Sequence, residues 1–254
     1  MTGNRQEPRL EVSGITKMFG GIRALTDISL EVLPKQIVGI IGPNGAGKTT
    51  TFNIITGAYR PSKGEVRLDG QAVTAEPSHR IAGAGVSRTF QNIRLFGDMT
   101  VWEHLLVAQP PSEFPLRRLL PTNWANPQAF RRSEEILEFL ELGDVKDRIA
   151  RSLPYGVQRR VEIARAISAK PKLLLLDEPV AGMNHDEADD IRRLMLTLRD
   201  SGLSILLIEH DMAFVMNLCD YLYVLDFGVM IAQGRPDEIR TNPTVLDAYL
   251  GHAT

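Results

Sequence analysis

The feature that most constrains the fold is an apolar stretch that runs directly into a glycine-rich loop. Residues 36–42 read QIVGIIG, and the chain continues with PNGAGKTT. A short, β-branched and wholly apolar stretch is typical of a strand buried on both faces. The pattern G-x-x-x-x-G-K-[ST] predicts a phosphate-binding loop, because its glycines let backbone N–H groups point inward and the next helix adds the positive end of its dipole. The alternative is a plain glycine-rich turn between strand and helix.

This motif predicts the role of each of its residues. We expect Lys48 to reach the β- and γ-phosphates of a nucleoside triphosphate and the Thr49 hydroxyl to ligate Mg²⁺. The residues expected to hold the nucleotide here are Gly42, Pro43, Asn44, Gly45, Ala46, Gly47, Lys48, Thr49 and Thr50.

A second motif, LLLLDEP, places two carboxylates at the end of another apolar run. Asp177 is expected to hold Mg²⁺ through water, and Glu178 to act as general base on the attacking water. An acidic pair at the start of a helix is the alternative. Together the two motifs predict only a nucleoside triphosphatase, a class that kinases, recombinases, GTPases and transport motors share.

The hydrophobic pattern predicts an α/β fold. Residues 9–33 alternate polar and apolar, which indicates two or three antiparallel strands. Further buried strands are expected at 172–177, 204–210 and 221–226. Helical patterns begin after residue 48, at 157 and at 186. This alternation predicts a mainly parallel sheet with helices on both faces.

A mostly helical subdomain is expected at residues 92–152, set into a nucleotide-binding α/β core formed by residues 1–91 and 153–254. Within it, residues 109–127 are rich in proline and have no clear period, which favours an irregular segment.

Composition excludes several classes of protein. The net charge of −2 gives no field that would attract nucleic acid. The single cysteine, Cys219, allows no internal disulfide and is expected to be a small buried hydrophobe in a reducing compartment. The longest apolar runs are far shorter than the ~20 residues of a membrane span. The stretch MTGNRQEPRL has no apolar core, so we do not expect it to be a signal peptide. We therefore expect a protein that is soluble alone and held at any membrane by a partner.

Four further features resemble the nucleotide-binding subunit of ATP-binding-cassette (ABC) transporters. They are SRTFQNIRLF, SLPYGVQRRVEIARA just before the DEP strand, VAGMN just after it, and LLIEHDM. The resemblance covers nearly the whole chain. It implies a single domain with a P-loop NTPase core of ABC type, an N-terminal antiparallel β subdomain and a helical subdomain.

The resemblance also implies roles for single residues. Phe19 would stack on adenine, Gln91 would touch Mg²⁺ and the attacking water, and His210 would bond the γ-phosphate. Asn184 stands where the family often has aspartate, in a loop that contacts the partner subunit. The alternatives are a core phenylalanine, an ordinary surface glutamine and a polar cap at a strand end.

The signature loop of this family, usually Leu-Ser-Gly-Gly-Gln, is altered here. Leu153 and Gly156 match, whereas Pro154, Tyr155 and Val157 differ. The backbone N–H of Gly156 and the following helix N-terminus keep the dipolar part of an anion site. We therefore expect Tyr155 and Gly156 to face nucleotide in a variant, working signature.

The variant loop, E-P-x-A-G-M-N, I-E-H-D-M and the tail NPTVLDAYLG resemble the ATP-binding proteins of branched-chain amino acid importers, in particular the larger of their two ATPase types. The resemblance implies ATP and Mg²⁺ as cofactors and a second ATPase subunit as partner, with a homodimer in isolation as the alternative. It further implies transmembrane permease subunits, an indirect link to a periplasmic solute-binding protein, and a peripheral position at the cytoplasmic face of the inner membrane.

Three other functions stay open from sequence: the ATPase of lipopolysaccharide export, a non-transport ABC ATPase of DNA repair or translation, and a non-catalytic regulatory subunit. The segment around Gln91 and residues 92–130 is expected to dock a membrane subunit, because aromatic side chains in such a protein often mark interfaces. The alternative is that they form the subdomain's own core. These aromatic residues are Phe96, Trp102, Phe114 and Trp124.

Overall fold

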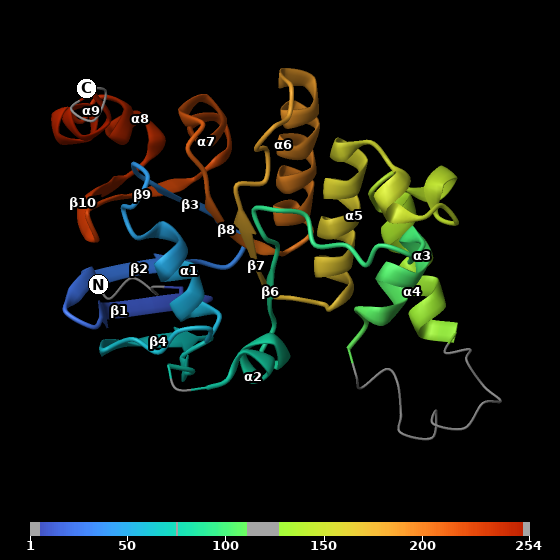
Figure 1. Ribbon diagram of the computed structural model, residues 1–254, viewed down its shortest axis with the longest axis horizontal. Helices are drawn as coiled ribbons and strands as arrows, with labels where there is room; N and C mark the ends of the chain where they lie inside the picture. Colours follow the sequence, from blue (N-terminus) through green and yellow to red (C-terminus); the bar gives the residue numbers. More distant parts are fainter. Residues whose placement is uncertain (1–5, 75, 111–126, 251–254) are drawn as a thin grey trace. The chain divides into compact units, whose positions relative to one another are not determined.

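The computed structural model describes residues 6–74, 76–110 and 127–250, which form two compact units (Figure 1). The first, here called the sheet unit, comprises Met1–Arg88, Lys172–Pro179 and Met195–Thr254. The second, the helical unit, comprises Thr89–Pro171 and Val180–Leu194. The sequence-based bounds assign residues from 153 onward to the core, whereas packing groups residues 153–171 and 180–194 with the helical unit.

An antiparallel sheet opens the chain, in the strand order β2-β1-β4-β5. Leu10, Val12 and Ile15 of the first strand are buried, because alternate residues of a strand face the same side. Of the two or three antiparallel strands predicted within residues 9–33, the structure has two, which pair with each other. The strands of this sheet are β1 (Leu10–Phe19), β2 (Ile22–Val32), β4 (Lys63–Leu68) and β5 (Gln71–Ala72).

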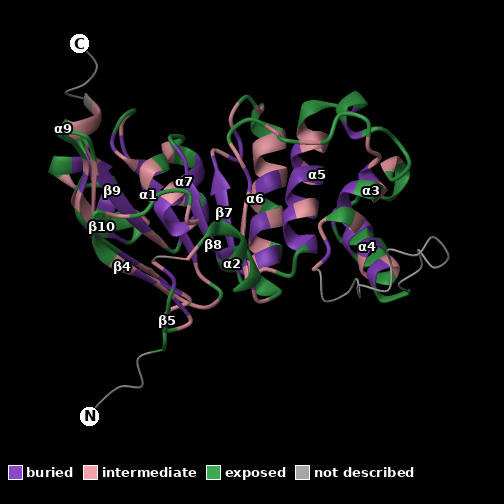
Figure 2. Cartoon of the chain, turned by 60° about the horizontal axis from the view of Figure 1, so that its bottom comes forward, coloured by how far each residue is buried: buried purple, intermediate pink, exposed green. Residues whose placement is uncertain are grey.

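A six-stranded sheet follows the order β10-β9-β3-β8-β7-β6, and every pairing is parallel except β10 with β9. Strands β3, β8 and β7, which are neighbours in this order, are buried at every position, as Figure 2 shows for β7 and β8. The mainly parallel sheet is therefore confirmed. Its strands are β3 (Ile37–Ile41), β6 (Val86–Arg88), β7 (Leu173–Asp177), β8 (Ser204–Ile208), β9 (Tyr221–Asp226) and β10 (Val229–Gly234).

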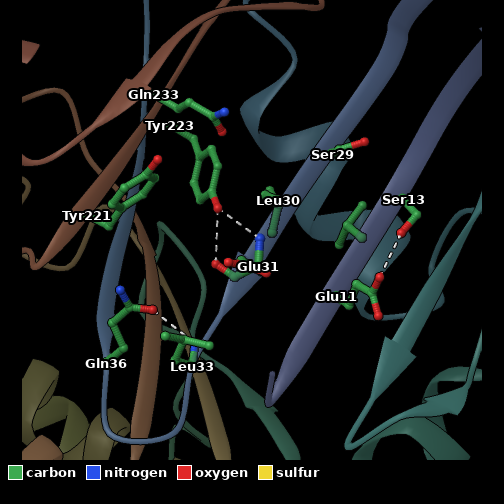
Figure 3. Close-up of a pocket in the computed structure, with 11 residues that line it drawn as sticks. Glu11, Ser13, Ser29, Leu30, Glu31, Leu33, Gln36, Tyr221, Tyr223 and Gln233 are labelled. Carbon is green, nitrogen blue, oxygen red and sulfur yellow. Dashed lines mark hydrogen bonds between the residues drawn. The ribbon is translucent and has the colours of Figure 1, made fainter. Parts of the chain in front are cut away.

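One hydrophobic cluster takes in side chains of both sheets, from Leu10 in β1 to Leu225 in β9. Hydrogen bonds between β9 and β2 also join the two sheets, beside a cavity of about 470 Å³ (Figure 3). There the Tyr223 hydroxyl accepts from the Glu31 backbone N–H (3.0 Å) and donates to its carbonyl (3.3 Å). Burial raises the pKa of Tyr223 to about 12, so the hydroxyl stays a donor at neutral pH.

Short helices complete the sheet unit. Asp211 caps α7, because its Oδ1 accepts from the Phe214 N–H at 3.0 Å. Cys219 follows that helix and is buried, as expected, and burial raises the pKa of its thiol. The helices are α1 (Lys48–Ile55), α2 (Ser78–Gly83), α7 (Met212–Leu218), α8 (Pro236–Arg240) and α9 (Pro243–Leu250).

The helical unit contains α3, α4, α5 and the first part of α6. Helices α3 and α4 lie within residues 92–152, and the bounds of the predicted subdomain stay a prediction. Most of the proline-rich segment lies outside the described residues. The bounds are α3 (Val101–Val107), α4 (Pro127–Phe139), α5 (Tyr155–Ser168) and α6 (His185–Asp200), with 3₁₀ turns at Gly143–Val145 and Ala150–Ser152.

His104 is fully buried in this unit with both ring nitrogens satisfied. Its Nδ1 lies 2.8 Å from the Thr100 carbonyl, which requires Nδ1–H, and its Nε2 accepts from the Phe96 N–H at 2.9 Å. A proton on Nε2 would point at the Phe96 N–H, which is itself a hydrogen-bond donor. Burial lowers the pKa of His104, and the charge of Arg165 lowers it further, while the Thr100 carbonyl and Glu103 oppose the shift.

Acid should therefore destabilise the protein through His104. The unfolded chain takes up the histidine proton near pH 6.5 and the folded chain does so only at lower pH, so stability falls as pH drops below about 6.5, by at most about 1.4 kcal/mol per pH unit. Between pH 7.5 and 5.5, denaturant titration should show a larger loss for the wild type than for His104→Gln. The exposed His79, changed to Gln, serves as the control. Equal losses in wild type and His104→Gln would contradict this assignment.

Candidate functional site

The glycine-rich loop after β3 requires glycine both for its backbone conformation and for close packing against neighbouring residues. Gly42, Gly45 and Gly47 all have positive φ, at 146°, 84° and 97°. A Cβ on Gly42 would lie 2.0 Å from the Leu225 carbonyl oxygen, and one on Gly47 would lie 2.5 Å from Leu25 Cδ2. Glycine is thus the residue that fits at Gly42 and Gly47.

Lys48 begins α1 and is 7% exposed. Its Nζ donates to the carbonyls of Gly42 (2.7 Å) and Pro43 (2.9 Å). Burial lowers the pKa of Lys48, and the carboxylates of Glu178 and Asp177 partly offset this. No side chain caps α1 and its first turn contains no acidic residue, so its N-terminal N–H groups keep their capacity to bind an anion.

The two carboxylates follow from the parallel register of the sheet. Asp177 ends β7 opposite Ile208 in β8, and it is 5% exposed. Glu178 has a left-handed backbone (φ 46°), and its N–H donates to the Ile208 carbonyl at 2.9 Å. A non-glycine residue in this conformation costs about 1–3 kcal/mol and is often found at functional sites. Its carboxylate lies 3.7 Å from His210 Nδ1.

Glu209 is a neighbour of this site that the sequence did not point to. It is fully buried, and its carboxylate accepts from the backbone N–H of His210 at 3.1 Å. The His210 side chain itself is 59% exposed, with Nδ1 3.8 Å from Glu209. The buried carboxylate therefore fixes the backbone from which His210 projects.

Arg88 is a second such neighbour, at the end of β6. Its Nη2 lies 2.8 Å from Asp177 Oδ2, and its Nη1 lies 2.7 Å from Asn53 Oδ1 in α1. The Arg88 and Asp177 side chains are 11% and 8% exposed. Arg88 thereby fixes the orientation of the Asp177 carboxylate and links it to the helix that follows the phosphate loop.

Removing this cation should be costly. Arg88→Gln leaves the Asp177 charge buried without its ion pair, which lowers the free energy of unfolding by about 3–5 kcal/mol. Denaturant titration should show less than additive losses in the double variant Arg88→Gln/Asp177→Asn. Arg67→Gln breaks an exposed pair with Glu65 and should cost less than about 1 kcal/mol. Strict additivity of the two changes would show that Arg88 and Asp177 are not coupled.

Phe19 lies at the end of β1 and is 41% exposed, so the alternative of a core phenylalanine is wrong. Its ring meets that of Tyr59 edge to face at 5.2 Å, and Lys17 Nζ lies 4.8 Å from its centroid. Tyr59 is 39% exposed. An exposed aromatic pair provides a face on which a base can stack, and sequence reasoning missed Tyr59 because it lies in a turn without periodicity.

The other predicted site residues belong to the helical unit. Gln91 is exposed, and its backbone carbonyl accepts from Arg159 Nη2 at 2.9 Å. Tyr155 begins α5 after the N-cap residue Pro154, which makes no side-chain cap hydrogen bond. The tyrosine is 42% exposed.

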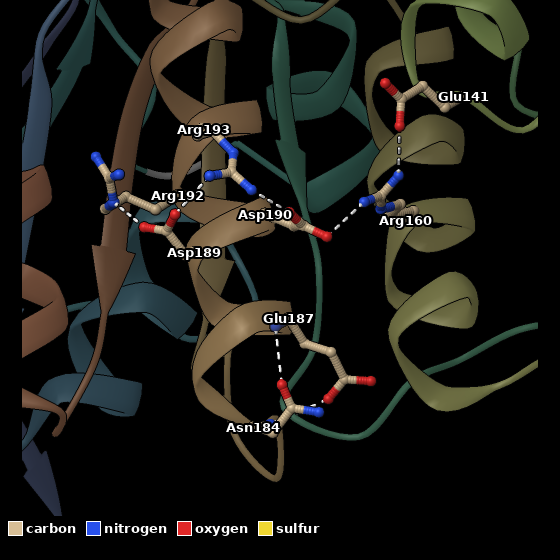
Figure 4. Close-up of polar contacts among 8 residues, drawn as sticks. All are labelled: Glu141, Arg160, Asn184, Glu187, Asp189, Asp190, Arg192 and Arg193. Atoms are coloured by element: carbon tan, nitrogen blue, oxygen red, sulfur yellow. Dashed lines mark hydrogen bonds and ion pairs between the residues drawn. The ribbon is translucent and has the colours of Figure 1, made fainter.

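Asn184 and Glu187 form a reciprocal pair at the start of α6 (Figure 4). The Asn184 N–H donates to Glu187 Oε2, and the Glu187 N–H donates to Asn184 Oδ1, both at 3.0 Å. Asn184 therefore has a local capping role. A Cβ on Gly156 would lie 3.2 Å from Glu187 Oε1, which places a carboxylate beside the signature glycine.

Comparison with known proteins identifies the family. A family profile described as ABC transporter matches residues 25–181. The chain belongs to the ABC transporter family. Residues 229–254 of this ABC protein also match a profile described as branched-chain amino acid ATP-binding cassette transporter.

Similar proteins agree with this family along almost the full chain. The high-affinity branched-chain amino acid transport ATP-binding protein BraF of Pseudomonas aeruginosa is 48% identical, over 97% of this chain and 99% of its own. LivG of Escherichia coli, which bears the same description, is 44% identical with the same coverage. The lipopolysaccharide export system ATP-binding protein LptB of Haemophilus influenzae is 34% identical, over 95% of this chain and 97% of its own.

Solved structures show the same fold. The ADP conformation of MJ1267, an ATP-binding cassette of an ABC transporter, has a TM-score of 0.86 and 34% identity, and the match covers 96% of this chain and 99% of that one. The ABC-type P-loop fold expected from the sequence is confirmed, and this ABC protein is an ATPase. Within the described residues, no helix is long and apolar enough to cross a membrane.

Proposed function

We propose that this ABC ATPase drives an importer of branched-chain amino acids. The observation that carries the proposal is the match to proteins described as branched-chain amino acid transport ATP-binding proteins, at 48% and 44% identity over nearly the full chain. The profile match at residues 229–254 supports the same solute class. Lipopolysaccharide export is the weaker candidate, because the related export ATPase is 34% identical.

The loop after β3 fits ATP. Its backbone is held open by glycines, the α1 N-terminus has no capping side chain, and Lys48 places a buried cation beside it. We assign the phosphate cradle to residues 42–50 and base stacking to Phe19, with Tyr59 as its ring neighbour.

The donor set also fits Mg²⁺. This ion is usually bound by one or two carboxylates together with substrate phosphates. The sheet unit offers one hydroxyl, Thr49, and one buried carboxylate, Asp177. The contact of Gln91 with the metal, implied by the resemblance, stays a prediction. Among the described residues no group of three or more His, Cys, Asp or Glu is arranged to hold a metal, so a site built from protein ligands alone is not seen there. When bound, Mg²⁺ neutralises charge on the phosphates.

The chain's own residues supply the proton chemistry. Glu178, whose backbone is left-handed (φ 46°), accepts a proton from the water that attacks the γ-phosphate. His210, anchored through Glu209, donates a hydrogen bond to the γ-phosphate. The Glu178 side chain is 17% exposed, which lets water reach it while limiting its hydration.

Glu178→Gln should abolish turnover and keep ATP binding. The amide has the size of the carboxylate but accepts no proton, so kcat falls by about 10²–10⁴. Lys48→Ala should show the opposite pattern, with ATP affinity lower by about tenfold or more, since a hydrogen bond to a charged group contributes about 1.5–3 kcal/mol. Calorimetry and phosphate release measure the two effects. Near wild-type hydrolysis by Glu178→Gln would reject its role as the base.

The partners follow from the same proposal. We assign a second, different ATPase subunit that completes each nucleotide site, transmembrane permease subunits, and a position at the cytoplasmic face of the membrane, where ATP is available. Phe96 is 54% exposed and suits a docking surface. Trp102 is half-buried and its ring packs on Phe130 at 5.4 Å, so it also belongs to the unit's own core. Phe114 and Trp124 lie outside the described residues.

The variant signature should still meet nucleotide in the assembled transporter. Gly156→Asp puts a carboxylate against the γ-phosphate, and it should lower the ATPase rate at least about tenfold, a barrier change of about 1.4 kcal/mol. Gly156→Asn, equal in size and uncharged, should retain more activity.

Gly156→Asp could also lower the ATPase rate by repulsion from the Glu187 carboxylate, which lies beside the same position. Making the change in a Glu187→Gln background removes this repulsion and leaves only the effect on the nucleotide. Under the proposal, Gly156→Asp stays defective in that background. Full recovery there would mean that the loop does not face the nucleotide.

A further inference from the structure

Three charged side chains of α5 face one short backbone segment. Arg159, Glu162 and Arg165 are spaced three residues apart, which keeps them on one side of the helix. Arg159 and Glu162 are both 0% exposed, and Arg159 is the largest fully buried side chain of the described chain. Buried charges destabilise a fold unless they are paired and hydrogen-bonded. The groups to which these side chains bind therefore indicate their role.

Arg159 makes four hydrogen bonds from one guanidinium group. Nη1 donates to the Phe90 carbonyl (2.8 Å) and to Glu162 Oε2 (2.7 Å). Nη2 donates to the Gln91 carbonyl (2.9 Å) and to the Tyr155 hydroxyl (3.2 Å). The guanidinium carbon also lies 5.8 Å from the centroid of the Tyr155 ring. One side chain thus joins the Gln91 backbone to the first residue of α5.

Glu162 and Arg165 hold the same segment a few residues further on. Glu162 Oε1 accepts from the Arg94 N–H at 3.3 Å. Arg165 Nη1 donates to the Arg94 carbonyl, and its Nη2 lies 4.0 Å from Glu162 Oε1. Residues 90–94 are therefore bound to α5 at both ends through main-chain groups, while the Gln91 side chain stays exposed.

We propose that Arg159, paired with Glu162, is a positioning residue that holds the Gln91 segment against the start of α5, so that Gln91 and Tyr155 keep a fixed relation. The role rests on the proposed function, in which both residues meet nucleotide. The contacts to main-chain carbonyls set where the exposed Gln91 projects. Tyr155 replaces a glycine of the usual signature, and its hydroxyl gives Arg159 an acceptor that glycine lacks.

Three variants test this role. Arg159→Lys keeps a cation beside Glu162 but lacks the planar fork that reaches four acceptors. The double change Arg159→Met/Glu162→Leu removes both charges at similar volume, which guards against a fold lost through an unpaired charge. Arg160→Lys is the matched control, because the neighbouring Arg160 faces outward and pairs with Glu141 (3.2 Å) and Asp190 (3.1 Å) in Figure 4.

Hydrogen–deuterium exchange and kinetics are the readouts. In Arg159→Lys and in the double variant, amide exchange across residues 89–95 should rise at least about tenfold, with β3 unchanged and ATP affinity of the purified chain within about twofold. The kcat of the assembled transporter should fall about tenfold to 100-fold with KM unchanged. Arg160→Lys should match the wild type in all of these.

Unchanged exchange at residues 89–95 would overturn the proposal, and so would a kcat of Arg159→Lys equal to that of Arg160→Lys. A parallel loss of melting temperature, ATP affinity and kcat in both variants would also reject it, since it would show a purely structural role. A wild-type chain that neither binds nor hydrolyses ATP would refute the proposed function instead, and the exchange measurement would still decide whether Arg159 holds the segment.

Discussion

The parallel pairing of β3, β8 and β7 is the constraint on which the candidate site depends. Because the carboxyl ends of parallel strands meet at one edge, ligands bind in α/β sheets at that edge. The phosphate loop with Lys48 leaves β3, Asp177 ends β7 with Glu178 next in the chain, and His210 follows β8. Residues that lie more than 100 positions apart in sequence thus become neighbours through register alone. A slip of one residue in β7 would reverse which face Asp177 occupies.

The site holds two of its groups in arrangements that lower the stability of the fold. Lys48 is a buried cation whose pKa is lowered by burial, and Glu178 has a left-handed backbone. Such features persist where the surrounding structure determines them. Here the supports are the buried Arg88–Asp177 pair and the Glu209 carboxylate that binds the backbone beside His210. The carboxylates of Glu178 and Asp177 offset the burial of the Lys48 charge only in part, and an anionic ligand would supply further negative charge.

Motifs with local mechanisms could be read from the sequence, and contacts between distant segments could not. The loop around Lys48 and the buried strands at 37–41, 173–177 and 204–208 follow from glycine spacing and apolar runs. The roles of Arg88 and Arg159 could not be predicted from sequence. An arginine in a strand or helix is expected to face solvent unless the fold brings a hydrogen-bond acceptor from a distant segment to it. The placement of α5 in the helical unit likewise depends on packing rather than periodicity. The roles of Gln91, Tyr155 and Gly156 stay predictions.

Locating the metal and the phosphates tests the central claim most directly. The measurement is a crystal structure of the wild-type chain with Mn²⁺ and a slowly hydrolysed ATP analogue, in which anomalous scattering places the metal. We expect the metal beside the Thr49 hydroxyl and the Asp177 carboxylate, with Lys48 Nζ within hydrogen-bonding distance of the phosphates. A nucleotide bound away from the loop after β3, or a metal remote from Asp177, would contradict this account of the site.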